Sequence, residues 1–454
     1  MKKSILTLTC LTLGFSALSA DLSEVFKQSQ THDPQLSAAK NTLNATAEGK
    51  KQAFAAFLPQ INGGWNKNTG TTETGGSLIP QQIFDINTEG WNVGINQSIY
   101  SQANYENFKI SKIQILKSIA DYDISYQDFI LRVAQSYFNV LGAQDSLLFS
   151  KAEEKAIGRQ LEQAEQRFEV GLAAITDVHE ARARYDGARA AVILANNLLE
   201  DANEALFEMT QKYYPQLAIV PDDIDISQFQ LSPIEAYQEM ALQSNPDLST
   251  AKFNADIAEK QISVNKAGHY PTVGLNFSRS HSLNPNATFS QSRPDPDNPG
   301  GFLIDIFETD RTSDSNTVTL NVNVPIFSGG RTQSQVRQSI HNHKAAMDRY
   351  EQIRRSIVRK VRNAYHGTIA AKSSVQARKQ AMISAQSGLE ATEAGYEVGT
   401  RTIVDVLLSQ RSFYQSQRDY SKAKYDYFIQ FLGLKRAAGS LSEDDISIIN
   451  EILK

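Results

Sequence analysis

The residues of this sequence that could do chemistry are few, and their spacing excludes most of it. His341 and His343 lie two positions apart in a predicted helix, where side chains point about 200° apart, so they cannot bind one metal ion. The segment Arg293–Gly301 has aspartates among prolines but lacks the spaced acidic ligands of a calcium loop, which indicates a surface loop. No phosphate-binding loop, G-x-S-x-G elbow or zinc motif occurs. We therefore predict no enzyme, no cofactor and no metal.

The charge and the cysteine content exclude further classes of protein. The first twenty residues read as a signal peptide, with Lys2 and Lys3 before the apolar run Ile5–Phe15 and a predicted cut after Ala20. Without these two lysines the 45 basic residues become 43 against 50 acidic ones, and the net charge of −5 becomes −7, which argues against a nucleic-acid partner. The single cysteine, Cys10, lies in the signal peptide, so the mature chain has no thiol for disulfides, metal binding or catalysis.

Four segments have the alternation of β-strands, with one apolar and one polar face. In residues 317–326, valine, leucine and isoleucine alternate with threonine and asparagine before Gly329 and Gly330 end the segment. Asparagine is unfavourable in strands, yet it occupies polar positions in all four segments. In a soluble sandwich the apolar face would meet a second sheet, whereas in an outer-membrane barrel it would meet lipid and the asparagines would line water. The other three segments are residues 60–66, 91–99 and 272–278.

Internal similarity shows that one ancestral unit was duplicated. Asp33–Lys40 resembles Asn245–Lys252, and Phe168–Gly171 resembles Tyr396–Gly399. We therefore predict two repeats after the signal peptide at residues 1–20. Each contains a helix, two strands, a long helix, a glycine turn, another helix and an acidic segment, and the second has a longer loop between its strands, within residues 283–315. The repeats cover residues 21–232 and 233–454.

Two proline-free stretches predict very long helices. They run from Gln102 to about Val170 and from Arg331 to about Val398, which is roughly 67 residues or about 100 Å each. Apolar residues recur every three or four positions, as in coiled coils, although an ordinary helical bundle has the same spacing. The first helix has two such stripes, which indicates neighbours on two sides. They consist of Ile115, Ile119, Tyr122, Tyr126, Phe129 and Val133, and of Ile130, Ala134, Tyr137 and Leu141.

One chain cannot complete a barrel by itself. A transmembrane strand needs about 9–11 residues, and a closed barrel needs at least about eight strands, of which this chain supplies four. Strands from several chains must therefore share one barrel if they enter a membrane. Helices of about 100 Å exceed the membrane core of about 30 Å, so they must project from it.

The strongest family resemblance lies in Arg167–Val178 and Gly395–Leu407, where the sequence resembles the TolC family of outer-membrane efflux and secretion channels. The resemblance implies an α+β membrane protein with two internal repeats. It implies a homotrimer in which long antiparallel helices form a periplasmic α-barrel and four strands per chain contribute to a 12-stranded transmembrane β-barrel surrounded by outer-membrane lipid. It also implies docking to a periplasmic adaptor and to an inner-membrane transporter of the RND, ABC or MFS class.

The two matching segments are predicted hairpin tips, because Gly171 and Gly399 follow long helices and suit a C′ position. The resemblance implies a polar gate at this periplasmic end. In it Asp177 pairs with Tyr396, and Arg401 reaches toward Thr176 and Asp177 of a neighbour. Helix-end capping is the alternative role for Thr176 and Asp177.

Asp405 matches an aspartate that forms an acidic ring in the pore constriction of the family. Many relatives have a second aspartate three residues later, where this chain has Leu408, so we expect a single ring. The tip residues Gly171–Leu172 and Gly399–Thr400 match the family's adaptor contact. Tight-turn geometry alone would also require these glycines.

The sequence thus predicts a passive channel-tunnel that exports drugs, toxic compounds or secreted proteins in a tripartite efflux or type I secretion system. It would lie in the outer membrane of a Gram-negative bacterium, project into the periplasm and be gated at its periplasmic end. The alternative is a periplasmic coiled-coil scaffold or adaptor protein.

Overall fold

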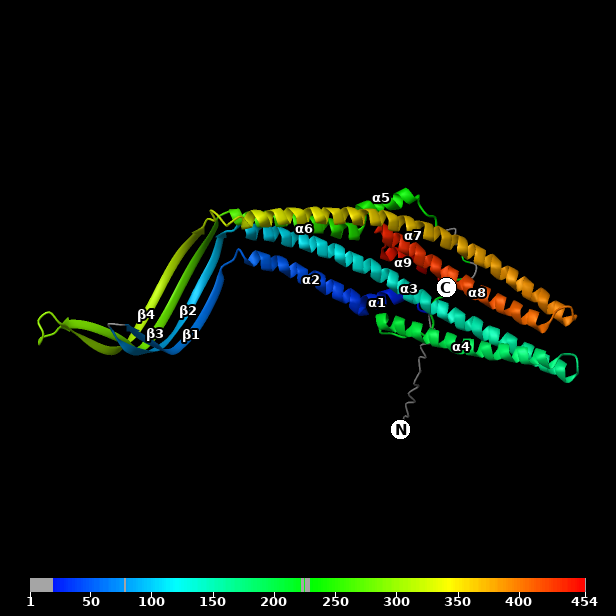
Figure 1. Cartoon of the computed structure of the whole chain (residues 1–454). Helices are drawn as coiled ribbons and strands as arrows, with labels where there is room; N and C mark the ends of the chain where they lie inside the picture. Colours follow the sequence, from blue (N-terminus) through cyan, green and yellow to red (C-terminus); the bar gives the residue numbers. More distant parts are fainter. Residues whose placement is uncertain (1–18, 77–78, 222–223, 225–228, 454) are drawn as a thin grey trace, which may run out of the picture. The chain divides into compact units, whose positions relative to one another are not determined.

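A computed structural model describes residues 19–76, 79–221, 224 and 229–453 (Figure 1). Most of the predicted signal peptide and most of the first acidic segment lie outside these residues. The same order of elements occurs twice, but each repeat starts with two helices where the sequence predicted one. The first set is α1 (Leu22–His32), α2 (Pro34–Ala55), β1 (Gln60–Gly76), β2 (Ile79–Tyr100), α3 (Gln102–Glu169) and α4 (Ile175–Thr210). The second is α5 (Ile234–Ser244), α6 (Pro246–Lys266), the 3₁₀-helix η2 (Ala267–His269), β3 (Thr272–Pro294), β4 (Phe302–Asn323), α7 (Arg331–Glu397) and α8 (Ile403–Ala438), followed by α9 (Glu443–Asn450).

The chain divides into two compact units, each described here by itself. The first unit combines the described residues up to Leu43 with Lys117–Lys252 and Arg349–Lys454. The second unit combines Asn44–Leu116 with Phe253–Asp348 and contains the four strands. Among the described residues, no helix combines the length and the apolar character needed to cross a membrane.

The two long helices confirm the lengths expected from their proline-free sequences. Helix α3 has 68 residues and α7 has 67, about 100 Å each. Both end in a Schellman motif. The N–H of Leu172 donates to the carbonyl of Arg167 at 2.7 Å, and that of Thr400 donates to the carbonyl of Gly395 at 2.8 Å.

The four strands of the second unit form one antiparallel sheet in the order β1-β2-β3-β4. Within the four predicted segments, residue pairing preserves the alternation, so most apolar side chains share one face and asparagine, serine and threonine share the other. Further along the sheet Arg279, Asn316, His281 and Asp314 lie on the same face as the apolar residues. Strand β4 ends at Asn323, short of the predicted Ile326, because Pro325 has no N–H to donate to a neighbour. The expected long loop within residues 283–315 is mostly strand, since only residues 295–301 separate β3 from β4.

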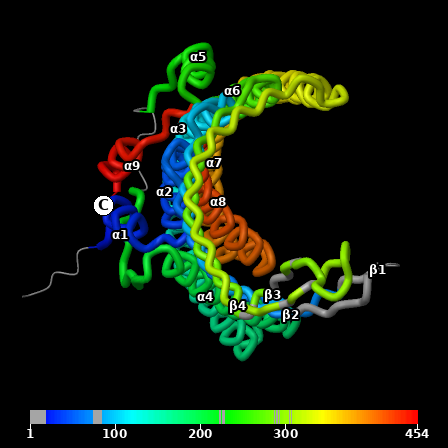
Figure 2. The backbone as a smooth tube through the Cα atoms, turned by 90° about the vertical axis from the view of Figure 1, so that its left-hand side faces the viewer, coloured from blue at the N-terminus to red at the C-terminus, as the bar shows by residue number. Residues whose placement is uncertain are grey.

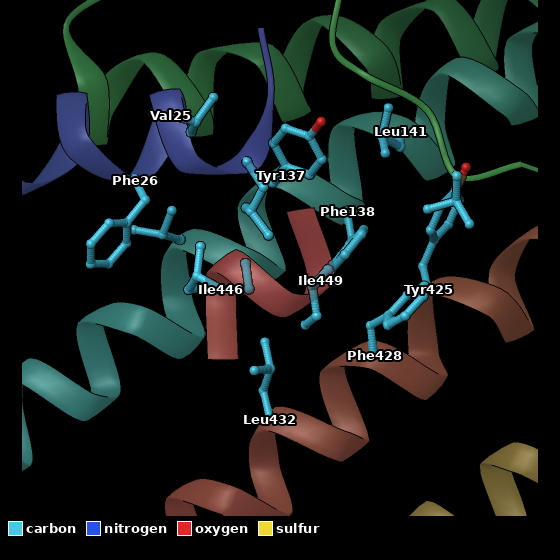
Figure 3. Close-up of a cluster of buried hydrophobic side chains, with 14 of the residues drawn as sticks. Val25, Phe26, Tyr137, Phe138, Leu141, Tyr425, Phe428, Leu432, Ile446 and Ile449 are labelled. Atoms are coloured by element: carbon cyan, nitrogen blue, oxygen red, sulfur yellow. The ribbon is translucent and has the colours of Figure 1, made fainter. Parts of the chain in front are cut away.

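The largest apolar core lies in the first unit. Both predicted stripes of α3 are buried where they enter it, including Phe129, Val133 and Tyr137. Phe138 of α3 stacks on Phe428 of α8 with ring centroids 5.4 Å apart. Side chains of α1 and α9 close this cluster from other sides (Figure 3). The short helices α1, α5 and α9 lie along one side of the long helices of this unit (Figure 2).

A glycine at the end of α8 fixes the junction between this helix and the start of α6. Gly439 has φ +74°, and a Cβ at this position would lie 2.6 Å from the Cα of Asn245. The Asn245 amide in turn donates to the carbonyl of Ala437 at 2.9 Å. Position 439 therefore needs glycine for two reasons: its φ is positive, and the backbone of Asn245 leaves no room for a side chain.

We expect Gly439→Ala to lower the thermal unfolding temperature, because a left-handed backbone costs an alanine about 1–2 kcal/mol before the clash is counted. Circular dichroism of the detergent-solubilised protein measures this change. Gly433→Ala is the matched control, since it lies inside α8 with open space around an added Cβ and should be neutral or stabilising. Equal melting temperatures of the two variants would contradict this account.

Candidate functional site

The two hairpin tips are the candidate functional site, and the fold places them as predicted. Gly171 and Gly399 have φ +76° and +79°, so each takes the left-handed conformation that ends its long helix. The next helix starts within a few residues, at Ile175 and at Ile403. A small apolar cluster that includes Ile157, Val178 and Ile403 joins the two hairpins near their tips.

Neither Thr176 nor Asp177 caps the start of α4 with a side-chain hydrogen bond. The N-cap residue is Ala174, which has no side chain to accept a hydrogen bond. Asp177 lies in the first turn, where its charge still interacts favourably with the helix dipole. Within the part of the chain that the structure describes, the Asp177 carboxylate has no hydrogen-bond or ion-pair partner. It therefore remains available to a neighbouring subunit.

Tyr396 lies at the end of α7 and packs against the apolar cluster between the hairpins. The guanidinium carbon of Arg167 lies 4.6 Å from the centroid of its ring, a cation–π contact from α3 to α7. The predicted pair of Tyr396 with Asp177 is not a hydrogen bond within this chain and stays a prediction. The sequence-based site missed Arg167, although it lies in the segment that carries the family resemblance.

Arg401 lies in the turn after α7, and its side chain passes directly over Gly395. A Cβ on Gly395 would lie 2.7 Å from the Cγ of Arg401, so only glycine fits here. Thr400 also closes on the same glycine, since its hydroxyl donates to the Gly395 carbonyl at 3.0 Å. Among the described residues the Arg401 guanidinium forms no ion pair within the chain, although its charge interacts with the nearby Asp405 carboxylate. Its predicted contact with a neighbour's Thr176 and Asp177 stays a prediction.

Asp405 forms a capping box with Thr402 at the start of α8. The Thr402 N–H donates to its carboxylate at 3.0 Å and the Thr402 hydroxyl donates at 2.8 Å, while the Asp405 N–H donates back to that hydroxyl at 3.2 Å. These donors, the backbone N–H first, hold the pKa of Asp405 below its ordinary value. The carboxylate therefore stabilises the helix start above the ordinary pKa and loses this role as the pH falls through the lowered one. The acidic ring in the pore stays a prediction.

Comparison with known proteins agrees with this geometry. The family model described as outer membrane efflux protein matches residues 25–210 and 238–440, which include both tips. The chain belongs to this family. Outer membrane protein TolC of Vibrio cholerae is 37% identical over 98% of this chain and 96% of its own length, and TolC of Escherichia coli is 35% identical over 100% and 90%. The alkaline protease secretion protein AprF of Pseudomonas aeruginosa is 26% identical over 97% and 88%.

Solved structures show the same fold for this efflux protein. The Campylobacter jejuni CmeC outer membrane channel superposes with a TM-score of 0.72 at 16% identity, covering 100% of this chain and 96% of that one. CusC gives 0.71 at 18% identity, covering 93% and 92%. The predicted family, fold class and outer-membrane location are confirmed, and the chain is an outer membrane efflux or secretion channel. The scaffold alternative is wrong, since the family lies in the outer membrane.

We expect Thr402→Ala to loosen the start of α8, because the substitution removes two of the three hydrogen bonds of the capping box. Amide hydrogen exchange should accelerate about fivefold in the first turn of α8. Ser442→Ala, at the N-cap of α9, is the matched control and should leave exchange in α8 unchanged. Unchanged exchange at Ile403–Val406 in the Thr402 variant would show that the capping box does not hold this tip.

Proposed function

We propose that three copies of this chain form a passive channel-tunnel that exports small toxic compounds or secreted proteins through the outer membrane, as part of a tripartite efflux or type I secretion system. The proposal rests on one observation above all. At the end of the four-stranded sheet nearest the helices, one face carries rows of apolar side chains and the other carries polar ones, and apolar side chains such as Val318, Leu320 and Val322 remain exposed in the single chain.

The register shows how complete the two faces are. One row across the four strands consists of Ile61, Ile95, Phe277 and Val318, and the next residues on each strand give Asn62, Gly94, Ser278 and Thr317. Val318 is 69% exposed, which would be costly for a sheet that faces water on both sides. Lipid against the apolar face and water against the polar face satisfy both rows.

Two tryptophans lie at one boundary of the apolar face. Trp65 and Trp91 are register partners, and the Trp91 ring stacks on His281 of β3 with centroids 6.1 Å apart. One row further along, Lys67 and Glu89 form an ion pair of 3.5 Å. The ten residues from Trp91 to Tyr100 span about 30 Å along a strand, and a strand tilt of about 40° reduces this to the height of a barrel's apolar band, about 25 Å.

The edges of the sheet support assembly of several chains. Among the described strands, β1 and β4 each pair with one neighbour and leave the other side unpaired. Unpaired backbone groups are not tolerated in hydrocarbon, and four strands are too few to close a barrel. Three copies would supply twelve strands and pair every edge.

We assign the gate to the hairpin tips, with Thr176, Asp177, Tyr396 and Arg401 as its polar residues. Asp177 and Arg401 have opposite charges. Within the described chain Asp177 has no ion-pair partner and Arg401 forms no ion pair, although its charge acts on the nearby Asp405, so a contact between subunits remains open to both side chains. Each such contact contributes about 0.5–1.5 kcal/mol, so three of them hold the tips closed only until a bound partner supplies more.

We assign the contact with the periplasmic adaptor to the two turns Gly171–Leu172 and Gly399–Thr400. Leu172 and Val398 are 77% and 75% exposed, and with the exposed Val170 they give the tips an apolar surface that a partner helix can cover. An inner-membrane transporter of the RND, ABC or MFS class would supply the energy. Asp405 would form an acidic ring through the carboxylate oxygen that the capping box leaves free.

Loss of the gate contacts should open the tunnel. We expect Tyr396→Phe combined with Arg401→Ser to raise single-channel conductance severalfold in planar lipid bilayers, because both substitutions remove polar links between hairpins. Tyr185→Phe with Arg189→Ser is the matched control, since it alters an arginine–tyrosine contact within α4 and leaves both turns unchanged. Conductance equal to that of the control would contradict the gate assignment.

The orientation of the sheet is tested at the centre of its apolar face. Val318→Arg should reduce the amount of folded protein recovered from outer membranes, because an arginine facing lipid at mid-membrane costs about 2–4 kcal/mol. Thr319→Arg, one residue later on the polar face, should be tolerated. Similar recovery of the two variants would argue that the two faces do not meet lipid and water as proposed.

A further inference from the structure

The helices α4 and α7 lie at the two outer edges of the paired hairpins in the first unit (Figure 1). Between them α3 and α8 contact each other through side chains, and α4 itself also approaches α8. Arg418 of α8 forms an ion pair of 2.8 Å with Glu153 of α3, and the hydroxyl of Tyr425 donates to Asp145 at 2.7 Å. Helix α4 also contacts α1, and α7 packs against α5, but each of the two helices keeps one exposed charged face.

The exposed face of α4 is acidic near the end of the helix. Asp201, Glu204 and Glu208 recur every three or four residues and are exposed, whereas Leu206 and Met209 on the other side are buried. Glu204 accepts a hydrogen bond of 2.8 Å from the Tyr213 hydroxyl. Within the part of the chain that the structure describes, Asp201 and Glu208 have no cationic partner.

The exposed face of α7 is basic over a matching length. Arg355, Arg359, Arg362 and His366 recur at intervals of four, three and four residues, on the side of the helix opposite the buried Ile357 and Val361. Arg355 pairs with Glu351 at 2.8 Å. Among the described residues, Arg359 and Arg362 have no carboxylate partner.

The two charged faces lie at the same height above the tips. Contact of Arg167 with Tyr396 shows that the two tips are level. Glu208 is 37 residues after Gly171 and Arg362 is 37 residues before Gly399, while Glu204 and His366 are each 33 residues from these glycines. At about 1.5 Å per residue, both pairs lie about 50–55 Å from the tip.

We propose that the acidic face of α4 binds the basic face of α7 of a second copy of this chain, with Glu208 opposite Arg362 and Glu204 opposite His366. The inference rests on the proposed trimer and adds the side chains that join its subunits. Charge complementarity selects this partner, since each face meets the opposite sign on a copy but has no such partner at its own level within the chain.

A contact of this type is heterologous, because it joins two different surfaces. Repetition of such a contact by a rotation of one third of a turn closes a ring of three. In this ring every acidic face of α4 contacts a basic face of α7. Ile193, which is 71% exposed on α4 nearer the tip, would be covered by the same contact. The mature chain has no cysteine if the predicted signal peptide is removed, which makes the contact accessible to site-directed cross-linking.

The first test replaces Arg362 and Glu208 with cysteine in one full-length chain and treats outer membranes with a short bis-maleimide. We expect covalent dimers and trimers on a denaturing gel. Lys360→Cys with Glu208→Cys is the matched control, because Lys360 is exposed on the same helix but points about 160° away from Arg362. Cross-links confined to single chains, or equal yields in the control, would overturn the proposed pairing.

The second test reverses the charges in the detergent-solubilised protein. Arg362→Glu alone and Glu208→Arg alone should each reduce the trimer population at least about tenfold, and the double variant should restore it. Failure of the double variant to recover would overturn the charge pairing. A wild-type chain that is monomeric in the same detergent would instead overturn the proposed trimer itself, so the two failures are distinguishable.

Discussion

Every backbone N–H and C=O group that enters hydrocarbon needs a partner, and the rest of this molecule depends on that constraint. The sheet of four strands satisfies it internally but leaves β1 and β4 with unpaired edges. Its apolar row around Val318 has no second sheet to meet within the described chain. Closure by sister subunits, as proposed, would remove the edges and give the polar face an enclosed aqueous space. The long helices then have to be compatible with the same rotational symmetry.

Features that depend on neighbouring residues in the sequence could be predicted from it. The ends of α3 and α7 follow from Gly171 and Gly399, which take the left-handed conformation that other residues avoid. The alternation in β4 follows from a period of two, and the buried stripes of α3 follow from intervals of three and four. In each case the physical cause lies within a few residues of its effect.

Features that depend on distant residues could not be predicted. Arg167 and Tyr396 are far apart in sequence, and only the packing of the two hairpins brings them together. The extra length of the second repeat was expected in a loop, but part of it lengthens β3, which has 23 residues against 17 in β1, because β4 supplies backbone partners for β3 as far as Pro294. The capping box of Thr402 and Asp405 has a local signal, the spacing of a hydroxyl and a carboxylate, which the interpretation as a pore ring obscured.

Duplication gave the two tips the same turn but not the same helix start. Asp405 and Thr402 hold the first turn of α8, whereas Ala174 leaves the first turn of α4 without a side-chain acceptor. In a ring of three copies, stiff and compliant tips would alternate around the opening. The tips between α3 and α4 would then move more than those between α7 and α8 when the opening widens. The opening would therefore widen with threefold rather than sixfold symmetry.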